Sequence, residues 1–144
     1  MLKALLLAGC VTVGAALTGA NFAADESPHH EHFMSCAKAC ADCQLQCDTC
    51  FHHCAMLVTD GKQEHAKCML LCVDCGDCCK LAASLAARHS PLAGLACDCC
   101  AKCCDECATA CEKLSNDKEM AACAKECRGC AKACREMLKH SGSK

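Results

Sequence analysis

The spacing of the cysteines constrains this chain more than any other feature. After residue 23 they recur in four blocks, mostly in alternating steps of three and four residues. Residues repeated in this way lie on one face of an α-helix, at the a and d positions of a heptad. Nineteen of these 22 cysteines obey the rule, and Cys78, Cys99 and Cys103 lie beside it. The nineteen seam cysteines are Cys36, Cys40, Cys43, Cys47, Cys50, Cys54, Cys68, Cys72, Cys75, Cys79, Cys97, Cys100, Cys104, Cys107, Cys111, Cys123, Cys127, Cys130 and Cys134.

The residues between the cysteines also favour helices. Ala, Lys, Glu, Leu, Met, Gln and Arg dominate, and the β-branched residues typical of strands are nearly absent. Turn-forming residues at 59–61, 89–91 and 114–117 predict the helix breaks, with Ser115 or Asn116 as the N-cap of the last helix. Four helices of about 24 to 28 residues with short loops predict an all-α, antiparallel four-helix bundle. The expected domain spans residues 33–140.

An ordinary apolar core is excluded by composition. The 144 residues include 23 Cys and 3 Phe, but no Trp or Tyr. Only 14 Leu, Val and Phe follow residue 24, too few to fill a bundle of this length. The sequence therefore predicts a core lined by thiols.

The N-terminal segment is typical of an export signal. Lys3 is followed by an uncharged run of small and apolar residues, which predicts a signal peptide over 1–23 and a polar leader over 24–32. We therefore expect an exported, periplasmic protein. Two alternatives are a membrane anchor, for which the run is short, and a lipid anchor at Cys10 in a lipoprotein-like Leu-Ala-Gly-Cys box.

Disulfide bonding is one alternative use of the cysteines. An exported chain with an even number of cysteines can form a stapled helical protein. Six cysteines on one helix face would, however, make wrong pairings as favourable as right ones.

An iron–sulfur cluster is a second alternative. Cys97, Cys100, Cys103 and Cys107 match the spacing of a bacterial ferredoxin run, with Ala108 in place of its proline. The helical frame already explains three of these four cysteines, and the other blocks lack the match.

A store of soft metal ions accounts best for a continuous thiol seam. Thiolates select Cu(I) and Zn, with cadmium as a further soft ion. About five zinc ions bound by four thiolates each would bury about ten negative charges, at a cost of several kcal/mol for each uncompensated ion. Cu(I) ions bridged by shared sulfurs leave the core almost neutral. The charge balance therefore predicts multiple Cu(I) ions per chain, with all 22 cysteines as ligands.

Two further ligand candidates lie where the seam continues past the cysteine blocks. His65 and Met120 are predicted at one end of the bundle, where imidazole and thioether would bind Cu(I) more weakly than thiolate. No His or carboxylate is placed to activate a cysteine as a nucleophile, so the chain is not expected to be an enzyme. A net charge of −2 gives no basic surface for nucleic acid.

The frame C-x3-C-x2-C-x3-C in all four blocks, from Cys36 to Cys134, resembles the bacterial copper storage proteins. The resemblance covers residues 33–140. It implies a preformed bundle that stores many Cu(I) ions along its axis, forms a homo-oligomer, and passes copper to apo-cuproenzymes or copper chaperones.

Overall fold

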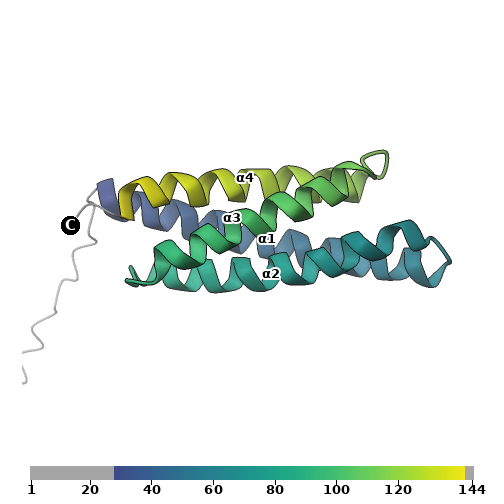
Figure 1. Cartoon of the computed structure of the whole chain (residues 1–144), viewed down its shortest axis with the longest axis horizontal. Helices are drawn as coiled ribbons and strands as arrows, with labels where there is room; N and C mark the ends of the chain where they lie inside the picture. The colour runs from purple at the N-terminus through teal and green to yellow at the C-terminus, as the bar shows by residue number, and fades with distance from the viewer. Residues whose placement is uncertain (1–27, 142–144) are drawn as a thin grey trace, which may run out of the picture.

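The fold is a bundle of four α-helices, seen in a computed structural model that describes residues 28–141 (Figure 1). A 3-10 helix, η1, precedes α2. The elements are α1 (Pro28–Thr59), η1 (Gln63–His65), α2 (Ala66–Ala87), α3 (Ala93–Glu112) and α4 (Lys118–Ser141). Both α1 and α3 pack against α2 and α4, and consecutive helices run in opposite directions. The predicted all-α, antiparallel four-helix bundle is confirmed.

The helices differ in length more than the sequence predicts. They contain 32, 22, 20 and 24 residues. The longest, α1, begins at Pro28, inside the stretch predicted as a polar leader, because proline is well suited to the first position of a helix. The shorter α3 begins only after Pro91, since the residue before a proline is disfavoured in helical conformation.

Two of the predicted breaks are C-terminal helix caps of the same type. Gly61 ends α1 with a φ of 90°, and its N–H donates to Val58 O at 3.0 Å. His89 ends α2 with a φ of 51°, and its N–H donates to Ala86 O at 2.9 Å. Such a left-handed residue satisfies the last carbonyls of a helix, and glycine adopts it without steric cost. The chain can therefore reverse its direction within a few residues after α1 and again after α2.

The third break is capped by a different residue from those predicted. Asp117 Oδ1 accepts hydrogen bonds from the N–H groups of Glu119, at 2.8 Å, and Met120, at 3.4 Å. This is the N-cap position, so the prediction of Ser115 or Asn116 is wrong. The additional turn after Leu114 delays the start of α4 to Lys118.

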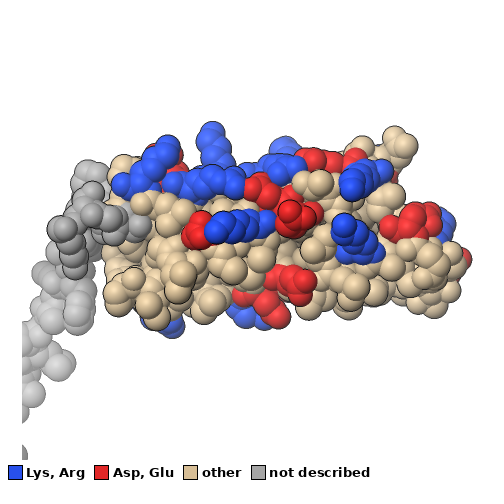
Figure 2. Space-filling view, in the orientation of Figure 1, with Lys and Arg blue, Asp and Glu red and all other residues tan. Residues whose placement is uncertain are grey.

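The bundle buries sulfur and displays charge. The buried residues are mainly the seam cysteines and alanines, with Phe33, Met120 and Met137 near the ends. In the face shown in Figure 2, most of the charged side chains gather over α3 and α4. Within residues 28–141, no helix is sufficiently long and apolar to cross a membrane.

Candidate metal centre

All nineteen seam cysteines point into the bundle. Each is at most 1 % exposed, and together they form a continuous column between the four helices. The column exists because the three-four spacing keeps every cysteine on the inner face of its helix. The predicted thiol core is therefore present in the structure.

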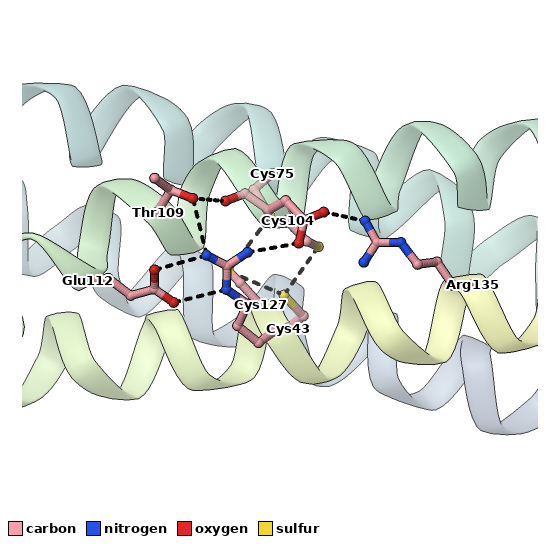
Figure 3. Close-up of polar contacts among 9 residues, drawn as sticks. Cys43, Cys75, Cys104, Thr109, Glu112, Cys127 and Arg135 are labelled. Carbon is pink, nitrogen blue, oxygen red and sulfur yellow. Dashed lines mark hydrogen bonds and ion pairs between the residues drawn. The ribbon is translucent and has the colours of Figure 1, made fainter.

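A central layer shows how the four helices each contribute one thiol (Figure 3). Cys43 Sγ of α1 lies 4.0 Å from Cys104 Sγ of α3 and 3.8 Å from Cys127 Sγ of α4. Cys75 Sγ of α2 lies 3.5 Å from Cys104 Sγ and 4.0 Å from Cys127 Sγ, which closes a ring. Metal–thiolate bonds of about 2.3 Å would place sulfurs around one ion at similar separations. The core is therefore spaced for soft ions without backbone movement.

Neighbouring thiol groups share members, which distinguishes the core from a set of separate four-ligand sites. Five groups, each with its sulfurs within 4.8 Å of one another, are Cys40, Cys100, Cys130, Cys134; Cys43, Cys79, Cys104, Cys130; Cys43, Cys47, Cys75, Cys127; Cys47, Cys107, Cys123, Cys127; and Cys50, Cys72, Cys111, Cys123. Five of these cysteines, among them Cys43 and Cys127, belong to two groups. Shared sulfurs suit bridged ions, and bridging reduces the charge that must be buried.

Burial affects the ionisation of Cys54, a thiol near one end of the column. Burial raises the pKa of Cys54 to about 11, since the low-dielectric core disfavours the thiolate. A thiol must lose its proton to bind a metal. Loading of such a site therefore releases a proton.

Both non-cysteine candidates lie at the end formed by the α1–α2 connection and the start of α4. Met120 is fully buried, and its Sδ accepts from Cys54 Sγ at 3.7 Å. His65 is 7 % exposed, and its Nδ1 has no hydrogen-bond partner. Glu64 Oε1 lies 3.8 Å from that nitrogen. A buried imidazole nitrogen without a partner is available to a metal ion, so the geometry suits the predicted ligand role.

The opposite end of the bundle carries a group of histidines. His30 Nδ1 lies 2.9 Å from His89 Nε2, and the His89 ring stacks on Phe33 with centroids 4.7 Å apart. His32 and His140 stack with centroids 3.7 Å apart. The left-handed conformation of His89 turns it back over the bundle, which the sequence signal of a helix break does not specify.

Three of the predicted ligands lie outside the core. Cys78 and Cys103 are half-buried and Cys99 is exposed, on the outer side of the α2–α3 contact. This placement also separates the ferredoxin-like run, because Cys103 faces outward whereas Cys97, Cys100 and Cys107 are buried. The run therefore does not converge on one cluster. All 22 cysteines within residues 28–141 are free thiols.

A network of charged side chains joins α3 to α4 outside the central thiol layer (Figure 3). Arg128, which follows Cys127, makes a two-point hydrogen bond to Glu112 with both distances 2.9 Å. It also donates to Asp105 at 2.9 Å. Arg135 contacts the same aspartate, and the two arginines lower the pKa of the Asp105 carboxyl. The network holds α3 against α4 beside the thiol column.

Comparisons with known proteins identify what this arrangement resembles. A family model described as copper storage protein matches residues 29–139. No curated protein matches the chain.

Solved structures that match the chain are also copper storage proteins. The Cu(I)-bound copper storage protein BsCsp3 has 34 % sequence identity and a TM-score of 0.68, over 74 % of this chain and 98 % of that one. A cytosolic copper storage protein from Streptomyces lividans, with five coppers, has 27 % identity and a TM-score of 0.71, over 77 % and 95 % of the two chains. The Streptomyces lividans protein loaded with 10 copper equivalents has 27 % identity and a TM-score of 0.70, over 76 % and 85 %.

The comparisons overturn the predicted periplasmic location. One matched relative is a cytosolic protein, so this fold does not require export. The segments on which the export prediction rested, the expected signal peptide 1–23 and the lipoprotein-like box at Cys10, lie outside the described residues.

Proposed function

The chain belongs to the copper storage protein family, and we propose that it stores Cu(I) as a column of thiolate-bound ions along the axis of its bundle. The observation that carries this conclusion is the continuous set of nineteen buried seam thiols, whose groups share sulfurs. Structures of relatives bound to Cu(I), to five coppers and to 10 copper equivalents support a capacity of many ions per chain. The family is one of storage proteins, not of enzymes.

The ligands proposed for the store are the nineteen seam cysteines, with His65 and Met120 at one end. Each thiolate neutralises one positive charge, so a ratio near one Cu(I) per cysteine keeps the buried charge small. The thioether of Met120 and the imidazole of His65 are weaker ligands than thiolates. They suit positions where an ion enters or leaves the column.

Delivery of the copper is a second part of the proposal. Cu(I) held by many neighbouring thiolates can pass to another soft-ligand site by exchange of one sulfur at a time. An apo-cuproenzyme or a copper chaperone is the class of recipient that this chemistry serves. Transfer is measured by mixing the loaded protein with such a recipient and following its copper content.

We also propose that the chain forms a homo-oligomer. Met34, Leu45 and Met56 recur at intervals of eleven residues on α1 and are all exposed, as are Leu70 and Leu81 on α2. These rows on two adjoining helices supply apolar surface that a second copy of the chain can cover. Light scattering should give a mass above that of one chain, and L45E or L70E should lower it. A monomeric wild-type protein would contradict the proposal.

An anaerobic titration with Cu(I) against a competing chelator tests the storage function, with thiols counted in parallel. We expect the reduced protein to bind more than about ten Cu(I) ions without visible absorption, as d10 ions with thiolate ligands do. Zinc in the same assay is the control. Saturation at about five zinc ions with weak Cu(I) uptake would exclude the proposed store.

A further inference from the structure

The three cysteines outside the core form a cluster of their own. Cys78 Sγ of α2 lies 3.2 Å from Cys103 Sγ and 3.8 Å from Cys99 Sγ, both of α3. Cys99 and Cys103 are four residues apart and therefore lie on one face of their helix. Three thiols from two helices thus meet on the outer side of the α2–α3 contact.

This outer cluster repeats the geometry of the core one residue earlier along each helix. The outer cysteines directly precede Cys79, Cys100 and Cys104 in the sequence. Those three form a core group with sulfur separations of 3.6, 3.7 and 3.9 Å. Successive residues of a helix point about 100° apart, so each Cys-Cys pair places one thiol inside and one outside. The contact between α2 and α3 is consequently lined by three thiols on each side.

We propose that Cys78, Cys99 and Cys103 form a second Cu(I) site, outside the core and accessible to solvent. The proposed function supplies the identity of the ion, and the geometry supplies the site. Metal–sulfur bonds of about 2.3 Å place the three sulfurs of a trigonal site about 4 Å apart. The separations of Cys78 Sγ from the other two sulfurs, 3.2 and 3.8 Å, lie near that spacing.

The surroundings of the outer site suit a metal ion that exchanges with solution. Cys99 is exposed, and Lys102 lies near enough to interact electrostatically with it. A thiol must lose its proton to bind a metal. Each sulfur that becomes a ligand releases one proton to solvent, and the ion keeps its oxidation state. An incoming thiolate can reach this ion without any opening of the bundle.

Protection from alkylation tests the site in the wild-type chain. Reduced protein is treated anaerobically with iodoacetamide before and after loading with Cu(I), and the modified cysteines are identified by mass spectrometry. We expect the three outer thiols to react at least about tenfold faster than core thiols in the copper-free protein, because they are accessible, and to be protected after loading. Equal reaction before and after loading, or a Cys78–Cys103 disulfide in the loaded protein, would overturn the proposal.

Release of copper to an excess of chelator gives a second readout. The loaded wild-type chain should lose about one Cu(I) in a fast phase, and C78S/C99S/C103S should lack that phase and bind about one ion fewer. The matched control, C79S/C100S/C104S, should keep the fast phase while its total capacity falls. Identical release curves for the wild type and the outer variant overturn the proposal. If the wild-type chain loads its core normally but shows no fast phase, the outer site alone is rejected. If the wild-type chain takes up no Cu(I) at all, the storage function is rejected as well.

Discussion

Cys54 Sγ donates to Met120 Sδ across 3.7 Å, which joins the thiol column of α1 to the first turn of α4. The contact places the thioether of Met120 where the column of thiols ends. Asp117, the N-cap of α4, holds that turn in position through the N–H of Met120.

The role of Met120 as a ligand is tested by M120L and M120A. M120L removes the sulfur but keeps the volume, so it should cost less than about 1.5 kcal/mol of stability. M120A should cost about 2 to 5 kcal/mol, because it leaves a cavity. M120L should also weaken the binding of about one Cu(I) ion, since the thioether is lost. Denaturation of the copper-free protein and chelator competition measure the two effects.

M137L, at an equally buried methionine of the opposite end, controls for packing. If M120L binds copper as tightly as the wild type, Met120 contributes packing and the ligand role is contradicted.

His65 should show opposite effects on stability and on copper binding. Its buried Nδ1 lacks a hydrogen-bond partner, so H65L removes an unsatisfied polar group and should stabilise the copper-free protein by about 1 kcal/mol. The same substitution should weaken binding of one Cu(I) ion, because it removes the imidazole. Chemical denaturation and chelator competition separate the two effects. H52L, at an exposed histidine of α1, is the control and should change neither. A destabilised H65L with normal copper binding would contradict the ligand role.

The copper-free protein should lose stability as the pH rises above about 9. The pKa of Cys54 is about 11 in the folded state and ordinarily 9.0, so the unfolded chain ionises first. This thiol's contribution is complete below pH 9 and is lost as the pH approaches 11. Each unit of difference in pKa corresponds to about 1.4 kcal/mol. Guanidinium denaturation at several pH values measures the loss.

The Cu(I)-loaded protein serves as control, since its thiols are already deprotonated. Stability that increased over this range would refute the assignment.

Arg128 should stabilise the pairing of α3 with α4. R128A removes the two-point contact with Glu112 and the bond to Asp105, and should lower the melting temperature by roughly 2 to 5 °C at low salt. R128K should recover only part of this, because a lysine cannot make the planar two-point contact. K102A is the control, since Lys102 pairs with Asp98 within α3 alone. Equal shifts for R128A and K102A would show that the network contributes nothing to helix pairing.

Much of the fold follows from local chemistry. The three-four spacing of the cysteines, the helix-favouring residues between them and turn residues such as Gly61 are properties of short segments. These signals correctly predict four helices, their breaks and the inward position of the nineteen seam thiols. The cap at Asp117 was missed because several neighbouring residues can cap a helix, and the length of the preceding turn decides between them.

The metal chemistry was also predictable in kind. A shortage of Leu, Val and Phe beside a surplus of cysteine predicted that thiols line the interior, and charge balance favoured Cu(I). The predicted periplasmic location is overturned by the comparisons, since a matched relative with this fold is cytosolic.

The sequence by itself therefore determined which cysteines share a helix face, because a helix of fixed pitch converts spacing into direction. Only the tertiary structure decided which thiols meet across helices. Cys43, Cys75, Cys104 and Cys127 form one layer because the lengths of three loops set the relative heights of four helices. The same packing separated Cys78, Cys99 and Cys103 from the store, because a residue one position off the seam faces the groove between two neighbouring helices instead of the axis shared by all four.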